Sequence, residues 1–156
     1  MSVIIPERRT ATTESSFVVF LIGMRINRPL KVHRWLPVSL AMGRMIKELS
    51  KMPDPDLLHH ESWPGRTTIM VQYWRSFEAL ERYAKNADLE HRPAWADFNR
   101  KISSNGDVGI WHETYQIEPG QFEVVYNNMP LFGLAAATSS VPAVGNRQQA
   151  RERLSA

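Results

Sequence analysis

The stretch Phe17-Val18-Val19-Phe20-Leu21-Ile22-Gly23-Met24 is apolar at almost every position. It is rich in β-branched and aromatic residues, which favours a strand, and it is too short to cross a bilayer, which needs roughly 20 apolar residues. A strand with one face in water alternates apolar and polar residues, and this one does not. We therefore expect both of its faces to be covered, one by helices and the other by a second layer, a ligand or a second subunit.

The segments around this strand predict a regular order of strands and helices. Ser76 is a good helix N-cap, and Pro37 is tolerated if it falls in the first turn of its helix. We expect strands at 16–26, 57–63, 67–74, 108–117 and 122–127, and helices at 35–51, 76–86 and 90–103. The order β-α-β-β-α-β, with an extra helical piece and a terminal hairpin strand, indicates an α+β protein with the ferredoxin-like split βαβ fold.

The apolar runs also predict an assembly. Ile69-Met70-Val71 repeats the unbroken pattern of residues 17–24. Because a ferredoxin-like sheet carries helices on one face only, we expect two sheets to pack face to face in a homodimer, which makes a dimeric α+β barrel. The expected organisation is a flexible N-terminal arm at 1–15, a barrel domain at 16–145 and a polar C-terminal tail helix at 146–156.

Composition narrows the classes of function. The 156 residues suit one domain, with 43% hydrophobic and 22% charged residues. The absence of cysteine excludes disulfides, thiolate metal sites and cysteine nucleophiles. The net charge of +3 is small and lies largely at the ends of the chain, so we expect neither nucleic acid nor a membrane as partner. The N-terminus lacks a signal-peptide pattern, which predicts a cytoplasmic protein.

Two histidines are candidates for chemistry. His91 is expected on one helix face with Trp95 and Phe98, where it could act as a base or ligate haem iron, or simply be a core or capping residue. His112 lies within a strand and shares a side with Ile110 and Thr114. The pattern does not say whether this side or the opposite one faces the barrel interior.

The run His59-His60-Glu61 looks like a metal cluster, but adjacent residues of a strand point to opposite faces. His59 and Glu61 therefore share one side and His60 lies on the other. Two ligands do not make a site, so no metal is expected. Fingerprints for zinc proteases and for tightly bound nucleotides are also absent from the sequence.

Aromatic residues suggest a cavity for a small molecule, with few polar anchors. The same residues would equally suit closure of the barrel and its dimer interface. The candidate lining residues are Trp74, Trp111, Tyr115 and Tyr126, with Tyr73 and Asn128 as polar anchors.

Four segments resemble a known family. They are Gly109-Ile110-Trp111-His112-Glu113-Thr114-Tyr115, Tyr126-Asn127-Asn128-Met129-Pro130, Phe132-Gly133-Leu134 and His91-Arg92-Pro93-Ala94-Trp95. They resemble the family related to a monooxygenase of fumagillin biosynthesis, a domain of unknown function in the dimeric α+β barrel superfamily. That superfamily includes cofactor-independent monooxygenases, haem-degrading enzymes, haem-dependent dehydratases and non-enzymatic stress proteins.

The resemblance implies a monooxygenase-like oxidoreductase that acts on a small hydrophobic metabolite, without a metal or flavin cofactor. The alternative is a haem- or small-ligand-binding barrel protein without turnover, with His91 as the haem ligand. In the enzyme, His112 is our first choice as the catalytic base and His91 the second. Tyr126 and Asn128 would orient the substrate.

Overall fold

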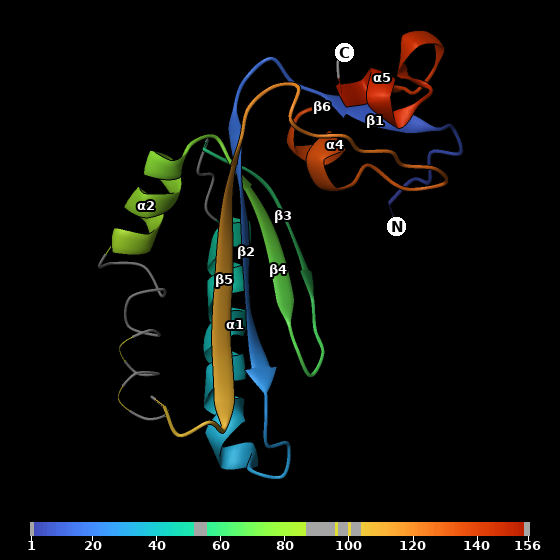
Figure 1. The fold of residues 1–156 in the computed structure, drawn as a ribbon. Helices are drawn as coiled ribbons and strands as arrows, with labels where there is room; N and C mark the ends of the chain where they lie inside the picture. The colour runs from blue at the N-terminus through green and yellow to red at the C-terminus, as the bar shows by residue number, and fades with distance from the viewer. Residues whose placement is uncertain (1, 52–55, 87–95, 97–99, 101–103, 155–156) are drawn as a thin grey trace.

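The computed structural model describes residues 2–51, 56–86, 96, 100 and 104–154. Its centre is a sheet of four antiparallel strands, shown in Figure 1, in the order β3-β4-β2-β5. This order confirms the ferredoxin-like prediction. The strands are β2 (Phe17–Ile26), β3 (Leu57–Trp63), β4 (Ile69–Trp74) and β5 (Val108–Ile117).

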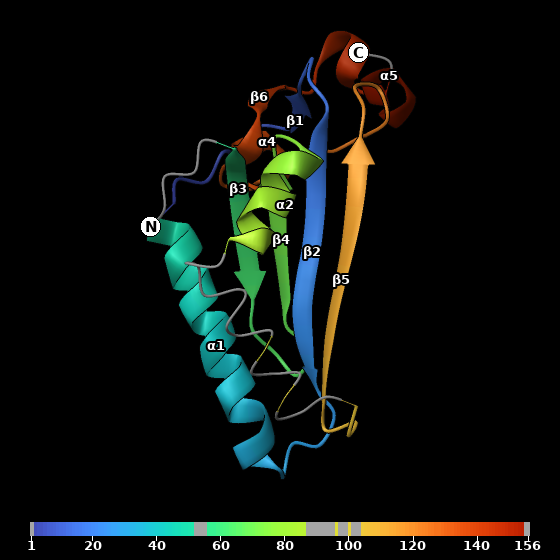
Figure 2. The same cartoon turned by 90° about the vertical axis from the view of Figure 1, so that its left-hand side faces the viewer.

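Helices α1 (Val32–Lys51) and α2 (Phe77–Lys85) lie against one face of the sheet (Figure 2). The even-numbered residues of β2 point to this face, and Val18 and Met24 are buried beneath the helices. The Ser76 hydroxyl caps α2 by accepting a hydrogen bond from the Ala79 backbone N–H, as expected. Because α1 begins three residues earlier than predicted, Pro37 lies beyond its first turn.

The opposite face of the sheet is covered at one end by the C-terminal lobe, which is formed by residues 118–154 together with residues 2–12 (Figure 1). In this lobe β1 (Arg9–Thr12) pairs with β6 (Ser139–Pro142). Phe17 and Val19, on the odd-numbered side of β2, pack against Leu134 and Ala135 of the lobe. The other lobe elements are α4 (Gly133–Ala137), a 3-10 turn (Gly145–Arg147) and α5 (Ala150–Leu154).

Two expectations about the chain ends are wrong. Residues 122–127 form no strand against β5; instead Tyr126 exchanges two backbone hydrogen bonds of 2.8 Å with Arg9. Residues 9–12 are correspondingly a paired strand rather than part of a flexible arm, and Thr10 is 2% exposed. The physical reason is the pairing of two segments distant in sequence, each with an unremarkable local pattern. The short tail helix is present as α5, whereas the helix expected at 90–103 lies outside the described residues except for positions 96 and 100.

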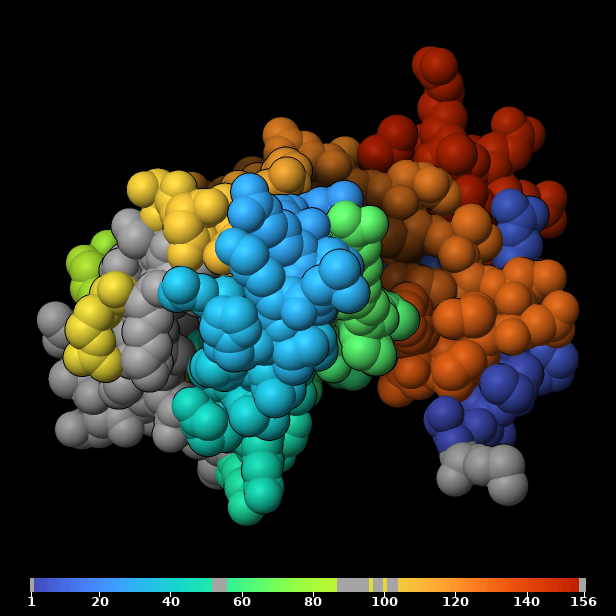
Figure 3. Space-filling model, turned by 90° about the horizontal axis from the view of Figure 1, so that it is seen from below, coloured from blue at the N-terminus to red at the C-terminus, as the bar shows by residue number. Residues whose placement is uncertain are grey.

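The sheet face opposite the helices, beyond the part beneath the C-terminal lobe, is here called the open face. Leu21, Ile69 and Val71 are half-buried on it. Seen from below in Figure 3, the surface is hollowed between the β3–β4 turn and the C-terminal lobe. The dual covering of β2 thus comes from helices on one face and from the lobe on part of the other. Within the described ranges, no helix has the length and apolar character needed to cross a bilayer.

Candidate active site

A histidine and a carboxylate form a dyad on the open face. His59 and Glu61 lie two positions apart on β3, and their Nε2 and Oε1 atoms are 2.9 Å apart. Their pairing with Tyr73 and Val71 of β4 places both on the open-face side, as alternation predicts. When Nε2 of His59 carries the proton, it donates a hydrogen bond to the Glu61 carboxylate, and Nδ1 is left as the atom that can accept a proton. His60 lies on the helix side of β3, where burial is the main cause that lowers its pKa.

Two tyrosine hydroxyls meet beside this dyad. A Cβ at Gly133 would lie 3.1 Å from the Tyr126 hydroxyl and 3.4 Å from the Tyr73 hydroxyl, so both phenols approach the same backbone position. Gly133 also has φ +56°, in the left-handed region that favours glycine. The backbone conformation at the start of α4 therefore favours glycine. Because glycine has no Cβ, there is room for both hydroxyl groups beside it.

Both phenols are held in their neutral form. Burial, followed by the nearby Tyr126 and Glu61, raises the pKa of Tyr73 to about 12. Burial also raises the pKa of Tyr126, against the opposing effect of hydrogen bonds from the backbone N–H groups of Ala135 and Leu134. A neutral phenol can donate a hydrogen bond, so Tyr73 and Tyr126 are two donors close to a base.

Aromatic rings border the cluster. Phe132 packs edge-on against Trp63 at the end of β3, with ring centroids 6.0 Å apart, and against Tyr126, at 6.3 Å. The ring of Tyr73 lies 6.4 Å from that of His59. The lobe therefore meets β3 through apolar surfaces, which suits a small hydrophobic molecule with a few directed polar contacts.

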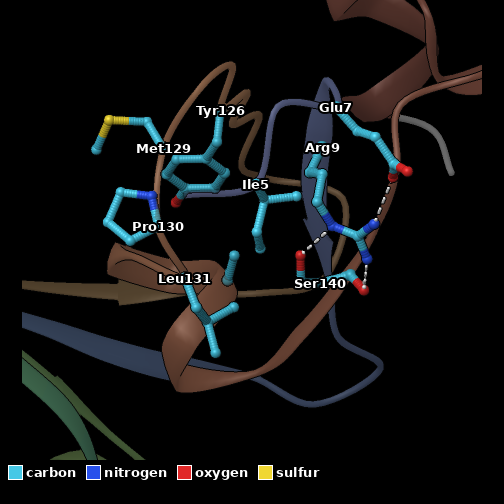
Figure 4. Close-up of a pocket in the computed structure, with 9 residues that line it drawn as sticks. Ile5, Glu7, Arg9, Tyr126, Met129, Pro130, Leu131 and Ser140 are labelled. Atoms are coloured by element: carbon cyan, nitrogen blue, oxygen red, sulfur yellow. Dashed lines mark hydrogen bonds and ion pairs between the residues drawn. The ribbon is translucent and has the colours of Figure 1, made fainter. Parts of the chain in front are cut away.

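A shallow pocket lies on the lobe side of Tyr126 (Figure 4). Its walls are mostly apolar and come from the N-terminal segment, the loop after Tyr126 and α4. The Arg9 guanidinium at its edge is committed to Glu7 and to both the hydroxyl and the carbonyl of Ser140. The lining residues are Ile5, Glu7, Arg9, Tyr126, Met129, Pro130, Leu131, Ala135 and Ser140.

The structure divides the residues proposed from the sequence between two faces. Trp111 and Tyr115 share the open-face side of β5 through their pairing with Gly23 and Val19. The Tyr115 hydroxyl donates a 2.6 Å hydrogen bond to Glu113 on the exposed part of this strand. The Trp111 indole packs on Gly23, where a Cβ would lie 2.8 Å from its Nε1 and 2.0 Å from the Thr68 carbonyl oxygen.

Trp74 and His112 lie on the helix side. Trp74 is fully buried in the core under α2, with its ring against Tyr83 and its Nε1 donating to Gln72 at 2.8 Å. His112 pairs with Ile22 and has its ring 5.7 Å from Phe20. Trp74 and His112 are therefore on the other side of the sheet from Trp111, Tyr115 and the His59–Glu61 dyad, so a single pocket on one face does not contain them all.

The last two residues proposed from the sequence, Asn128 and His91, are not part of the cluster around the His59–Glu61 dyad as the structure describes it. Asn128 is exposed with φ 53°, so its asparagine suits a left-handed turn. His91, and with it the haem alternative, lies outside the described residues. Among the residues the structure does describe, no three His, Asp or Glu side chains are grouped so as to hold a metal ion.

The sequence pattern indicated part of this cluster. Alternation put His59 and Glu61 on one side, and Tyr73 was a candidate polar anchor. The role of Gly133 had no local signal, because it depends on tyrosines 60 and seven positions away that only the fold brings together. The fold and the cluster together define a ferredoxin-like α+β protein with a histidine and a carboxylate on its open sheet face and two phenols where the sheet meets the C-terminal lobe.

Comparison with known proteins places this chain in a family. A family profile described as Monooxygenase af470-like matches residues 17–134. The chain belongs to this family, which confirms the resemblance noted from the sequence. The match includes the whole sheet, the dyad, both tyrosines and Gly133.

Individual similarities are more distant. The chain is 27% identical over 124 residues to the Aspergillus fumigatus protein named Monooxygenase af470, and the match covers 74% of the chain but only 44% of that protein. A crystal structure of aldoxime dehydratase matches with a TM-score of 0.64 and 18% identity, covering 94% of this chain and 42% of that one. The structure of SnoaB, a cofactor-independent oxygenase from Streptomyces nogalater, has a TM-score of 0.46 and 10% identity, covering 67% of this chain and 95% of that one. The aldoxime dehydratase match supports the fold alone.

Proposed function

We propose that the chain is a monooxygenase that oxidises a small hydrophobic molecule bound on the open face, next to the C-terminal lobe. The observation that carries this proposal is the His59–Glu61 dyad beside the neutral hydroxyls of Tyr73 and Tyr126. Membership of the Monooxygenase af470-like family and the name of the Aspergillus fumigatus relative support the reaction class.

In the proposed reaction, the chain supplies proton transfer and needs no metal or flavin. His59 Nδ1 removes a proton from an acidic C–H of the substrate, while Glu61 stabilises the imidazolium that forms. The substrate carbanion then reduces O2 and forms a C–OO⁻ peroxide anion, which takes the proton back from the His59 imidazolium and becomes a C–OOH hydroperoxide. Loss of water from this hydroperoxide gives a carbonyl, so a CH2 group and O2 become C=O and H2O, without any added reductant.

The two tyrosines would stabilise the charge that develops during proton removal. When the acidic C–H lies next to a carbonyl or in a phenolic ring, the negative charge moves onto the substrate oxygen. Donors already oriented toward that oxygen lower the barrier, because they need no reorganisation as charge appears. We therefore infer that the substrate carries such an oxygen, held by Tyr73 and Tyr126.

His112 is the competing base, because the sequence favoured it. Its position on the helix side means that the two assignments place the substrate on opposite faces of the sheet. Variants of the two histidines therefore distinguish the faces as well as the residues.

The test begins with identifying small molecules that co-purify with the protein, by mass spectrometry, and then following oxygen uptake with them. We expect His59→Ala to lower kcat by about 10²–10⁴-fold, as for loss of a general base. Tyr73→Phe and Tyr126→Phe should each lower it by roughly tenfold or more. His60→Ala is the matched control, since it removes a neighbouring imidazole from the other side of the strand, and dialysis against a chelator should leave the activity unchanged.

Three results would contradict the proposal. Full activity of His59→Ala with loss in His112→Ala would move the site to the helix side. Unchanged turnover in both variants would exclude both His59 and His112 as the base. A co-purifying ligand that is bound but not oxidised would identify a binding protein without turnover.

A further inference from the structure

The N-terminal segment 2–12, here called the N-terminal strap, holds the backbone of Tyr126. On one side of the strap β1 pairs with β6, and on its other side the backbone of Arg9 both donates to and accepts from that of Tyr126, at 2.8 Å each. The Ile5 N–H adds a further bond to this side, to the Met129 carbonyl oxygen at 2.9 Å. The strap therefore lies between β6 and the residues that carry the Tyr126 phenol.

The Arg9 side chain fastens the strap to β6. Its Nε donates to the Ser140 hydroxyl at 2.8 Å, and its Nη2 donates to the Ser140 carbonyl oxygen at 2.7 Å (Figure 4). Its Nη1 lies 3.1 Å from the Glu7 carboxylate. A planar guanidinium can make two directed bonds to one residue in this way, whereas the single ammonium of a lysine cannot reproduce that geometry. Arg9 thus joins Tyr126, through its backbone, to β6, through its side chain.

The hydroxyl end of Tyr126 depends on the same strap. This hydroxyl lies at the start of α4, 3.1 Å from the position that a Cβ on Gly133 would take. Helix α4 rests on the strap in turn, because Ala11 of β1 is buried in one cluster with Leu134 and Ala135. Both the backbone and the phenol of Tyr126 are therefore positioned against the N-terminal strap.

We propose that Arg9 is a positioning residue of the candidate active site, which acts through Tyr126 by holding its hydroxyl in the direction of the substrate oxygen. The role of Tyr126 in this inference rests on the proposed function. A misplacement of about 1 Å in a positioned group can lower a rate by about 100-fold, so the element that fixes a donor matters as much as the donor. The family profile matches residues 17–134, so the strap lies outside the matched part of the chain.

The first test needs no ligand. The chain has four tyrosines, so full-length protein made with 3-fluorotyrosine gives four ¹⁹F resonances, and Tyr126→Phe identifies the one that belongs to Tyr126. We expect Arg9→Ala to shift this resonance and to lower the pH at which it titrates, because water reaches a loosened phenol more freely. Arg8→Ala is the matched control, since it removes an exposed arginine one position away and should leave the resonance unchanged.

The second test is a double-mutant cycle on kcat, measured by oxygen uptake with the co-purifying substrate. Arg9→Ala should lower kcat by roughly tenfold or more, as Tyr126→Phe does. In the Tyr126→Phe background, Arg9→Ala should cause no further loss, because the hydroxyl that it positions is already gone. A residue that only stabilised the fold would instead lower kcat by the same factor in both backgrounds.

Two milder variants guard against misfolding. Arg9→Lys and Ser140→Ala each keep part of the contact between the strap and β6, so each should melt close to the wild type and still shift the Tyr126 resonance in the same direction. An unmoved Tyr126 resonance in all three variants would overturn the proposal, and so would an equal change in Arg8→Ala.

The two proposals fail in different ways. If no ligand is oxidised, the monooxygenase proposal is wrong, whereas the Tyr126 resonance still shows whether Arg9 positions that phenol. If turnover is found and the losses in Arg9→Ala and Tyr126→Phe multiply fully, the reaction class stands and the positioning role of Arg9 is wrong.

Discussion

At the scale of single residues, the candidate site depends on two hydroxyls that water does not reach freely. Tyr73 and Tyr126 belong to β4 and to the C-terminal lobe, and they meet only because residue 133 has no side chain. Burial makes ionisation costly for both phenols, so each stays a hydrogen-bond donor throughout the physiological pH range.

The raised pKa of Tyr73 predicts a stability change in alkali. Its folded pKa of about 12 lies above the ordinary value of 10.0, so the unfolded chain loses this proton first as pH rises. The contribution of the neutral Tyr73 phenol to the free energy of unfolding is therefore complete below about pH 10, and it is lost as the pH rises toward 12. Urea midpoints measured across this window should fall less steeply in Tyr73→Phe than in the wild type. If the urea midpoint fell equally steeply with pH in both proteins, the burial of the Tyr73 phenol would be contradicted.

At the scale of elements, a buried carboxylate joins the start of α1 to the start of β5. Asp107 is 3% exposed and accepts from Lys31 Nζ at 3.0 and 3.2 Å, while Arg28 and Arg34 lie within 3.4 and 3.8 Å. The hydrogen bond from Lys31, followed by the charges of all three cations, lowers the pKa of Asp107 despite the opposing effect of burial.

Asp107→Asn should destabilise the protein at neutral pH. The pKa of Asp107 is lower in the folded protein than its ordinary value of 3.8. The stabilisation by its ionised carboxylate is therefore present above pH 3.8 and is lost as the pH falls through the folded pKa. The difference in urea midpoint between wild type and variant should thus be large at pH 7 and shrink in acid. Asp56→Asn is the control, since Asp56 also pairs with two arginines but is more exposed, and its effect should be smaller.

At the scale of the whole molecule, the apolar open face of the sheet predicts that a second layer of protein packs against it. Leu21, Ile69 and Val71 are only half-buried there, and large apolar sheet faces are rarely left in water. We therefore retain the proposal of a homodimer through this face, which would enclose the His59–Glu61 dyad between two sheets.

The dimer proposal has a direct test. Light scattering at micromolar concentration should give twice the chain mass of 17.9 kDa. Val71→Asp, which places a charge in the centre of the open face, should shift the protein toward the monomer, whereas Val144→Asp in the C-terminal lobe should not. A wild-type monomer at these concentrations would show that the open face functions without a second subunit.

The sheet and its helices could be predicted from local patterns because their signals are local. The bounds of β3 and β5 agree with the prediction, and those of β2 and β4 differ from it by no more than two residues at either end. The Ser76 cap was predicted from a residue type that satisfies unpaired N–H groups within one turn. The pairing of 9–12 with 139–142 and the loss of the strand at 122–127 could not be predicted, because they depend on competition between partners over 100 residues apart.

The sequence by itself determined the ferredoxin-like order of elements, the family, and the alternation that puts His59 and Glu61 on one side of a strand. Only the tertiary structure decided that His112 and Trp74 lie on the helix side, and that Tyr73 and Tyr126 meet at Gly133. The physical reason is that periodicity fixes which residues share a face, whereas what covers each face is set by the packing of segments distant in the chain.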